Sequence, residues 1–498
     1  MIEMTLREIA QIVGGELHDV ADPEALVTGS VEFDSRRAGP GDLFLALPGA
    51  NADGHDYAAR AVAQGAVAVL AARPVGVPAI VVAPDPGAVP ATSVALSHDD
   101  SAGSGAAVLA ALAELARVST ERLAERTGLT VVGVTGSSGK TSTKDLLAAV
   151  LTPLGSVVAP PGSFNSELGH PWTALRAGLD TRFLALELSA RGVGHIAAAA
   201  RITPPRIGVV LNVGTAHLGE FGSREAIAVA KGELVEALPA EGLAVLNADD
   251  PHVSAMAART KARVVKVGLS GDADIRATDV RTDDQARASF TLHAGGESVP
   301  VELAVHGEHQ VGNALAAAAV ALECGADLAT VAHALGGATA ASARRMDVRT
   351  TPDGITVVND SYNANPDSVR AALKALVTLA KAGEQPRRSW AVLGEMGELG
   401  DDSVIEHDAI GRLAVRLDVD RLIVVGTGRP SRGMHQGAVM EGSWGEESVL
   451  VPDIDAAIAL LDDEIAAGDV VLVKASKAVG LWAVAEHLTR AGEGSTQA

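Results

Sequence analysis

The stretch Thr130–Leu151 reads TVVGVTGSSGKTSTKDLLAAVL, and the rest of the chain is organised around it. Its first residues, Thr130–Val134, form an apolar, β-branched run that is typical of a buried parallel strand. A glycine-rich turn follows, and then a helix with apolar residues on one face. This order predicts a phosphate-binding loop, because backbone N–H groups and the positive end of the helix meet at the turn.

The turn also carries the two side chains that such a loop uses. Lys140 supplies a positive charge for the terminal phosphates, and Thr141 supplies a hydroxyl for magnesium. The alternative is a glycine-rich turn that binds nothing, and the two flanking elements argue against it. Val134 stands where the usual pattern has glycine, so the loop is a poor match to GTPases and small-molecule kinases. We expect the phosphate-binding residues to be Thr135, Gly136, Ser137, Ser138, Gly139, Lys140 and Thr141.

The composition limits the class of protein. A chain of 498 residues should hold about three domains, and its cores must be built from Ala, Val and Leu because only 2% of the residues are aromatic. The 40 basic and 62 acidic residues give a net charge of −22, which argues against a binder of nucleic acid or of anionic membranes. A single cysteine, Cys324, and a start without signal-peptide character favour a cytoplasmic protein. We expect it to be a monomer.

Changes in composition divide the chain into three expected domains. A polar segment rich in glycine and serine, 98–105, reads as a linker. Short strands alternate with helices along the chain, which predicts an α/β fold with parallel sheets. A β-rich insertion is expected from about residue 275 to 305, within the second domain. The expected domains are residues 1–98, 106–338 and 340–498.

Candidate binding residues in the second domain follow its strands, where ligands of open α/β sheets gather. Glu187 stands near the carboxyl end of one strand, in a position to meet magnesium. His217 follows the next strand, although a lone histidine there is also a common packing or capping residue. Lys231 is expected at the margin of a buried helix face, and a lysine that extends to solvent is the alternative. Asn165 lies in a rigid polar turn.

Further candidates lie in the two outer domains and at the start of an alanine-rich helix. Asp34-Ser35-Arg36 follows a strand, and is either an anion pocket or a turn with a solvated arginine. His309 and Asn313 are four residues apart, so both side chains can face one ligand. In the third domain, the loops 360–366, 394–400 and 474–477 occupy equivalent strand ends and read as binding loops or plain connections.

Several of these segments resemble the Mur ligases. Within that family, DSYNANP at 360–366 and GEMGELG at 394–400 resemble the members that add a dipeptide. Members that add the third amino acid typically carry Asp-Asn-Pro-Arg in this domain, and this sequence lacks it. The other segments that carry the resemblance are TGSSGKTSTKD, Asn212–His217, AKGEL around Lys231, NAD at 247–249 and HGEHQVGNALAA.

The resemblance implies a fold and a set of ligands. The fold would have a small N-terminal α/β domain that binds UDP, a central P-loop ATPase with a parallel sheet, and a Rossmann-like C-terminal domain. ATP and magnesium would be the cofactors. The metal ligands would be Thr141, Glu187, His217 and Lys231, the last as a carbamate.

The resemblance also assigns nucleotide and substrate contacts. His309 and Asn313 match the adenine-binding segment, and Asp360 matches the ribose contact. Arg345 matches an arginine that contacts the nucleotide, but Ala343-Arg344 departs from the usual Pro-Gly, so the choice between Arg344 and Arg345 stays open. The expected substrate contacts are Asp34, Ser35, Arg36, Asn165, Asn363 and Asn365, and the expected catalytic residues are Lys140, Glu187, His217 and Lys231.

The reaction that the resemblance implies is an ATP-dependent amide ligation. D-alanyl-D-alanine would be added to UDP-N-acetylmuramoyl-tripeptide through an acyl phosphate, in the synthesis of peptidoglycan precursors. One alternative is another ligase of the superfamily, of the tripeptide-forming or folylpolyglutamate type. A second alternative is a protein that hydrolyses ATP without joining two substrates. This alternative gives no function to Asp34–Arg36 and Asp360–Pro366.

Overall fold

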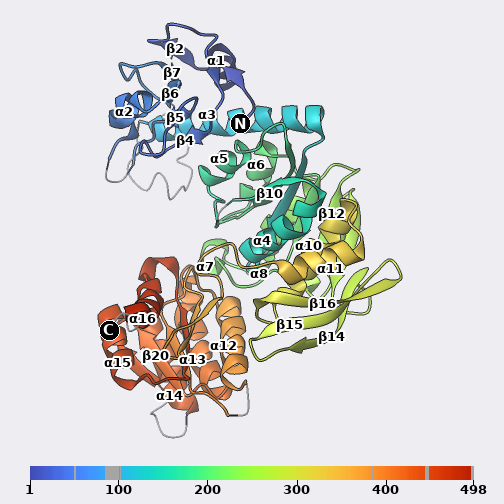
Figure 1. The fold of residues 1–498 in the computed structure, drawn as a ribbon, viewed down its shortest axis with the longest axis vertical. Helices are drawn as coiled ribbons and strands as arrows, with labels where there is room; N and C mark the ends of the chain where they lie inside the picture. The colour runs from blue at the N-terminus through green and yellow to red at the C-terminus, as the bar shows by residue number, and fades with distance from the viewer. Residues whose placement is uncertain are drawn as a thin grey trace.

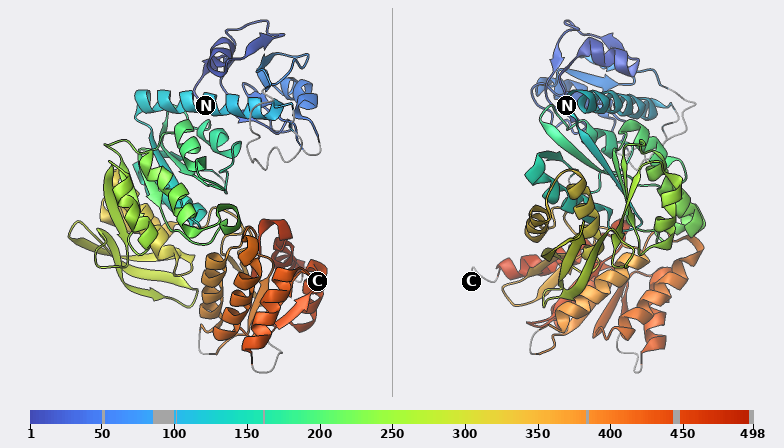
Figure 2. Two further views of the ribbon diagram at one scale, coloured as in Figure 1. Left: turned by 180° about the vertical axis from the view of Figure 1, so that it is seen from behind. Right: turned by 90° about the vertical axis from the view of Figure 1, so that its right-hand side faces the viewer.

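The protein consists of three α/β parts stacked along its long axis, as the computed structural model shows (Figure 1). The structure describes residues 1–49, 52–84, 100, 102–160, 162–382, 385–442 and 448–494. Of the expected linker 98–105, residues 98, 99 and 101 lie outside the described residues, and its last two residues already belong to a helix. Figure 2 shows the same three parts from behind and from the side. None of the described helices is long and apolar enough to cross a membrane.

The N-terminal part is built on a sheet of order β2-β7-β6-β5-β4, parallel except for β2. The strands β5 and β6 and the helix α2 between them follow the alternation of strands and helices that the sequence predicts. The elements are β1 (Met4–Thr5), α1 (Leu6–Val13), β2 (Glu16–His18), β3 (Leu26–Val27), β4 (Val31–Glu32), β5 (Leu43–Leu45), α2 (Ala58–Ala63), β6 (Ala68–Ala71) and β7 (Ala79–Val81).

A 24-residue helix, α3 (Ser104–Thr127), joins the N-terminal part to the central part. It runs between the two parts in Figure 1 and shares one apolar core with both. The sequence pattern predicts a helix only over 106–117, because Ser119 and Thr120 interrupt the apolar run, yet both side chains are buried. The helix ends at Gly128, which adopts the left-handed conformation (φ 72°) that glycine tolerates.

The central part has a sheet of order β16-β15-β14-β13-β12-β11-β8-β10-β9, parallel from β9 to β14. The β-rich insertion expected at about 275–305 is confirmed as β14, β15 and β16, and these strands continue the central sheet as an antiparallel edge. The strands are β8 (Thr130–Thr135), β9 (Ser156–Val158), β10 (Thr181–Glu187), β11 (Ile207–Val210), β12 (Leu243–Asn247), β13 (Arg263–Gly268), β14 (Ile275–Thr282), β15 (Arg287–Ala294) and β16 (Glu297–His306).

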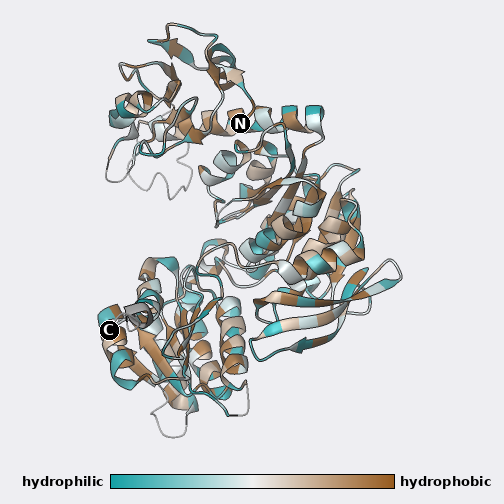
Figure 3. Ribbon diagram, viewed as in Figure 1, coloured by the Kyte–Doolittle hydropathy of each residue, from teal (hydrophilic) through white to brown (hydrophobic). Residues whose placement is uncertain are grey.

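Helices cover both faces of the central sheet, and alternate residues of β10 enter two cores. On one face, α4 and α10 pack closely because alanines line α10. Figure 3 shows apolar residues along the strands of the sheets and along the helices that pack on them. The helices are α4 (Lys140–Leu151), α5 (Gly169–Ala174), α6 (His195–Ile202), α7 (Leu218–Phe221), α8 (Arg224–Glu236), α9 (Pro251–Ser254), α10 (Gln310–Glu323) and α11 (Leu328–Gly337).

The C-terminal part has a sheet of order β17-β18-β22-β19-β20-β21, in which only β17 is antiparallel. This arrangement confirms the parallel sheet expected there, with a core on each face. Its elements are β17 (Asp347–Thr350), β18 (Thr356–Asn359), α12 (Pro366–Ala380), β19 (Ser389–Leu393), α13 (Ser403–Arg416), β20 (Arg421–Val425), α14 (Arg429–Glu441), β21 (Ser448–Val451), α15 (Ile454–Glu464), β22 (Val470–Lys474) and α16 (Trp482–Gly494).

Candidate active site

The phosphate-loop sequence forms the turn between β8 and α4, as its flanking elements predict. Gly139 immediately precedes α4 with φ 82°, and a Cβ there would lie 2.6 Å from Asn313 Oδ1. The positive φ favours glycine, and a Cβ would in addition force the Asn313 side chain to move. Lys140 Nζ folds back and donates a hydrogen bond to the carbonyl of Gly136 (2.6 Å), and burial lowers the pKa of its ammonium.

Asn212 shapes the loop from a neighbouring strand end. Its Oδ1 accepts hydrogen bonds from the backbone N–H of Ser137 (2.9 Å) and of Ser138 (3.0 Å). Its Nδ2 donates to the carbonyl of Ser138 (3.2 Å). The segment Asn212–His217 carries the family resemblance, but the shaping role of Asn212 could not be assigned from the sequence because the contact spans 75 residues.

Glu187 ends β10 beside the loop, as expected. Its carboxylate accepts a hydrogen bond from Asn165 Nδ2 (3.2 Å) through Oε2. Its Oε1 is buried and, among the described residues, has no hydrogen-bond partner. Nearby, the hydroxyls of Thr141 and Ser163 lie 2.8 Å apart. A buried carboxylate oxygen without a donor fits a hard cation, so the donor set of Thr141 and Glu187 suits magnesium.

Lys231 differs from its sequence-based placement. It is not at the margin of α8 but buried, with 3% of its surface exposed. Burial, and then the charge of Lys140, hold the pKa of the Lys231 ammonium well below its usual value. Within the described parts of the chain, no hydrogen bond or ion pair of Lys231 is found. The alternative of a lysine that extends to solvent is therefore wrong.

His217 meets the C-terminal part. Its backbone adopts a left-handed conformation (φ 62°), which is strained for a residue other than glycine. Its Nδ1 lies 2.7 Å from Glu398 Oε2 and 3.5 Å from Glu220 Oε2. These three residues each offer a ligand atom within 4.8 Å of the others. The contact with His217 lowers the pKa of the Glu398 carboxyl.

The two neighbouring arginines point in different directions. Arg345 donates from Nη2 to the hydroxyls of Thr141 and Ser163, both at 3.1 Å, and lies 4.1 Å over the ring of Tyr362. Arg344 instead pairs with Glu486 at 2.9 Å. Of the two candidates, Arg345 is thus the one beside the phosphate loop.

Asp360 occupies the expected strand end, but its side chain already has protein partners. Its Oδ1 accepts from the backbone N–H of Met346 (3.1 Å), and its Oδ2 lies 2.6 Å from Lys474 Nζ. Lys474 also donates to the carbonyl of Asn363 (2.9 Å). Burial lowers the pKa values of both Lys474 and His309. The negative charge of Asp360 raises both pKa values and so partly offsets this effect. The sequence places Lys474 at the start of a candidate binding loop but does not indicate its pairing with Asp360.

Two other expected binding residues have structural partners as well. Asn365 caps α12 through a hydrogen bond from the backbone N–H of Ser368 to its Oδ1 (2.9 Å), and its Nδ2 reaches the carbonyl of Ser137 (3.4 Å). Asn313 donates to Gln310 Oε1 (2.8 Å). Asn365 thus contacts the phosphate loop at Ser137, and Asn313 lies beside the same loop at Gly139.

The N-terminal candidates lie apart from this cluster. Arg36 forks onto the carboxylate of Asp34 (2.7–3.2 Å), and its hydrogen bonds hold the pKa of Asp34 at about 2. Ser35 is buried next to them. Among the described residues, no hydrogen bond or ion pair joins these three residues to the phosphate loop. The N-terminal part does contact the central part through Trp172, whose Nε1 donates to the carbonyl of Val31 (2.7 Å).

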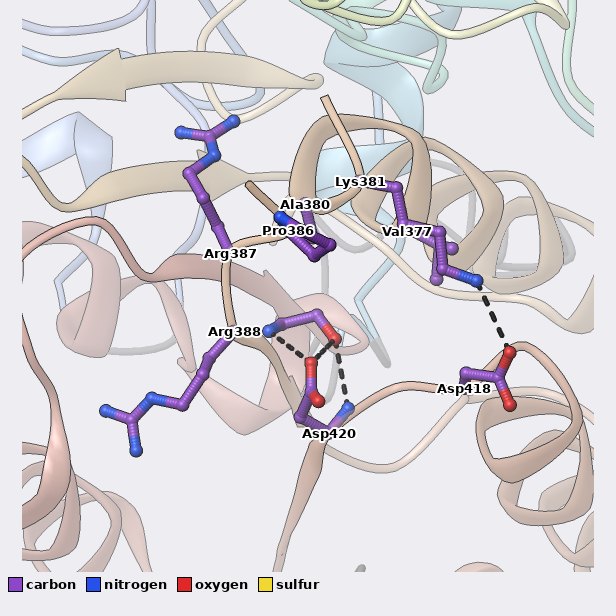
Figure 4. A pocket seen from close by; sticks show the side chains of 9 residues that line it. Val377, Ala380, Lys381, Pro386, Arg387, Arg388, Asp418 and Asp420 are labelled. Atoms are coloured by element: carbon purple, nitrogen blue, oxygen red, sulfur yellow. Dashed lines mark hydrogen bonds and ion pairs between the residues drawn. The ribbon is translucent and has the colours of Figure 1, made fainter. Parts of the chain in front are cut away.

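A cavity of about 220 Å³ on the C-terminal part is not part of this cluster (Figure 4). Its charged groups are already paired: Lys381 with Asp418, Arg388 with Asp469, and Asp420 with Ser389. A second cavity, also of about 220 Å³, lies beside the phosphate loop. It is lined by α4, β16, the start of α10 and the segment around Arg345.

Family comparisons agree with this geometry. The chain matches the Mur ligase family catalytic domain over residues 29–117, the Mur ligase middle domain over 134–321 and the glutamate ligase domain of Mur ligases over 344–477. It is 61% identical to UDP-N-acetylmuramoyl-tripeptide–D-alanyl-D-alanine ligase from Mycobacterium tuberculosis, over 98% of both chains. The chain belongs to the Mur ligase family.

Solved structures agree with the fold of this Mur ligase. It matches MurF from Acinetobacter baumannii with a TM-score of 0.81 at 29% identity, covering 98% of this chain and 99% of that one. It also matches MurF ligase from Thermotoga maritima in complex with ADP, with a TM-score of 0.74 at 29% identity, covering 94% and 99%. The expected three-domain fold with a central P-loop part is thus confirmed, while the domain boundaries stay predictions.

Proposed function

We propose that this Mur ligase joins D-alanyl-D-alanine to UDP-N-acetylmuramoyl-tripeptide with ATP as the energy source. The observation that carries the proposal is the similarity to the mycobacterial ligase, 61% over nearly the whole chain. The loops DSYNANP and GEMGELG support it from the site itself, because Asn365 and Glu398 in these loops contact the central part. The uridine nucleotide would bind the N-terminal part near Asp34, Ser35 and Arg36.

ATP would bind with its phosphates along the loop from Thr135 to Thr141. Lys140 would leave its internal hydrogen bond to Gly136 and turn to the terminal phosphates. Arg345 would contact the transferring phosphate, because its guanidinium already lies on Thr141. His309 and Asn313 would flank the nucleoside. Asp360 would act by fixing its loop through Met346 and Lys474, with the ribose as a further contact.

Magnesium would bind at Thr141 and Glu187, where it would neutralise charge on the phosphates. The free Oε1 of Glu187 supports this assignment. A second metal would use Lys231 as a carbamate and His217. The lowered pKa of Lys231 favours the neutral amine, which is the form that attacks CO₂ to give the carbamate and a proton. His217 would first have to leave Glu398.

The reaction would proceed in two steps. The terminal carboxylate of the tripeptide attacks the γ-phosphorus of ATP, and ADP leaves, so that an acyl phosphate forms. The amine of D-alanyl-D-alanine then attacks the acyl carbon, loses a proton, and displaces inorganic phosphate. Lys140 and Arg345 would stabilise the charge on the transferring group, and the contacts that dock the C-terminal part would hold the two substrates in position.

The cellular setting belongs to the same proposal. We expect a monomer in the cytoplasm that binds neither nucleic acid nor membrane. The net charge of −22 supports this setting because it repels anionic polymers and surfaces. The positive groups that anionic substrates need are concentrated at the phosphate loop.

A product assay tests the function. UDP-N-acetylmuramoyl-tripeptide, ATP and magnesium are incubated with D-alanyl-D-alanine, with single amino acids, or with a folate and glutamate. Mass spectrometry identifies the product and a coupled assay measures phosphate. We expect a product only with the dipeptide; a product with single amino acids or folate favours the superfamily alternatives, and phosphate without any product favours a plain ATPase. Lys140→Ala should abolish turnover, whereas Lys261→Ala, at an exposed lysine of the same part, should not.

A further inference from the structure

Two buried charged residues on α4 have no role in the proposed reaction. Lys144 and Asp145 lie one turn after the phosphate loop, with only 2% and 8% of their side chains exposed, and Lys144 Nζ is 2.5 Å from Asp145 Oδ1. Burying an ion pair costs desolvation energy that the attraction between the charges offsets only with further hydrogen bonds. The positions of those further bonds therefore indicate what the pair does.

The pair holds the segment that enters the C-terminal part. We call residues 338–346, between the end of α11 and the start of β17, the hinge. The backbone N–H of Ser342 donates to Asp145 Oδ2 (3.1 Å), and its hydroxyl donates to Asp145 Oδ1 (3.1 Å). Lys144 Nζ donates to the same hydroxyl at 3.3 Å. Ser342 itself is buried.

The hinge carries Arg345 in a strained backbone. Arg344 (φ 61°) and Met346 (φ 50°), on either side of it, both adopt left-handed conformations without being glycine. Such strain persists only where the surrounding contacts fix the chain. The second cavity lies along the hinge and is lined by both Asp145 and Arg345, so packing does not support the segment on that side. The hydrogen bonds of Ser342 with Asp145 and Lys144 restrain the hinge backbone three residues before Arg345.

Lys144 also contacts the backbone shortly before Ser163, the other partner of Thr141. Its Nζ donates to the carbonyl of Pro160 (2.6 Å), three residues before Ser163. Ser163 and Arg345 both contact the Thr141 hydroxyl, at 2.8 and 3.1 Å. A single buried ammonium thus contacts the two segments whose side chains meet at the proposed phosphate and magnesium position.

We propose that Lys144, Asp145 and Ser342 form an interdomain clamp that positions Arg345 for phosphoryl transfer. They are positioning residues, because none of them contacts the reacting atoms. The proposal rests on the proposed function for its catalytic meaning. It predicts that removal of the clamp lowers activity in an enzyme that has Arg345 and has no effect in an enzyme that lacks Arg345.

A double-mutant cycle tests this dependence. Ser342→Ala removes the hydroxyl and is the mildest change at the clamp. We expect it to lower kcat about tenfold, the effect of one lost hydrogen bond to a charged group, with the KM for D-alanyl-D-alanine unchanged. In an Arg345→Ala background, Ser342→Ala should cause no further loss. Losses that multiply in the double variant, or a Ser342→Ala enzyme with normal kcat, would overturn the proposal.

Control variants separate positioning from general damage. Ser342→Thr keeps the hydroxyl and should restore most of kcat. Glu486→Gln breaks the ion pair on the outer side of the hinge, at Arg344, and should leave kcat unchanged. If Ser342→Thr does not restore kcat and Glu486→Gln lowers it, the clamp is not specific and the proposal fails.

A binding measurement tests the clamp independently of the proposed reaction. The same cycle is measured as the Kd of a non-hydrolysable ATP analogue with magnesium, by calorimetry. We expect Arg345→Ala and Ser342→Ala each to weaken binding several-fold, and the double variant to be no weaker than Arg345→Ala. If the wild type makes no dipeptide product, the proposed function fails, and the Kd cycle alone decides the clamp: coupling supports it and additivity overturns it.

Discussion

Lys231 is buried close to a second lysine, Lys140, which is an unusual position for a lysine side chain. Its lowered pKa favours the neutral amine, which is the form that would react with CO₂ in the proposed carbamate. We predict that ¹³C-labelled bicarbonate gives a carbamate signal in the NMR spectrum of the wild type, and that Lys231→Met lacks it and loses about 100-fold in kcat, as expected for a lost charge-stabilising group. A Lys231→Met enzyme with full activity would contradict the carbamate role.

His170 provides a pH-dependent contribution to stability. Burial lowers the pKa of its imidazole from 6.5 to about 4. Between these pH values the unfolded chain binds the proton and the folded chain does not, so the free energy of unfolding falls as the pH drops from 6.5 to 4, by roughly 3 kcal/mol. We predict that unfolding monitored against pH shows this loss in the wild type and not in His170→Gln. Parallel pH profiles would refute the assignment.

At the same scale, contiguous motifs were predictable and distant partners were not. Lys140, Thr141 and Glu187 follow from a strand, a turn and a strand end, all local patterns. Lys474 and Asn212 were not assigned their roles, because each acts through contacts with residues far along the chain. The burial of Lys231 was misjudged because the face of a single helix does not show which neighbouring elements cover it.

At the scale of the elements, Asn365 has two possible roles, because it precedes α12 as its cap and was also expected to contact substrate. Its Oδ1 caps the helix at Ser368. We predict that Asn365→Ala lowers the free energy of unfolding by about 1 kcal/mol, whereas Asn365→Ser, which also caps well, does not. Thermal unfolding measures this difference. If both variants unfold like the wild type but lose turnover, Asn365 serves the substrate and not the helix.

Element types were predicted better than element extents and pairings. The strand β8 matches the apolar run at 130–134 because that run is short and is followed by a glycine-rich turn. The length of α3 was underestimated because its buried polar residues look like an exposed end. The pairing of β14–β16 with the central sheet was missed because strand partners are set by tertiary packing.

At the scale of the whole molecule, the C-terminal part is docked against the central part through a close backbone contact. The N–H of Gly219 donates to the carbonyl of Glu398 (3.1 Å), and a Cβ at Gly219 would lie 2.4 Å from the backbone nitrogen of Gly400. We predict that Gly219→Ala opens this contact, increases the radius of gyration in X-ray scattering, and raises the KM for ATP. Gly271→Ala, where a Cβ meets nothing within 4 Å, is the matched control. Unchanged scattering and KM in Gly219→Ala would contradict the docked arrangement.

The central claim is that ATP activates the carboxyl end of the peptide at the phosphate loop. The most direct test uses UDP-N-acetylmuramoyl-tripeptide labelled with ¹⁸O in its terminal carboxylate, in a complete reaction with D-alanyl-D-alanine. The carboxylate oxygen that attacks the γ-phosphorus leaves with the phosphate. The account therefore predicts one ¹⁸O atom in each phosphate released, alongside the pentapeptide product. Unlabelled phosphate, released while product forms, would contradict it.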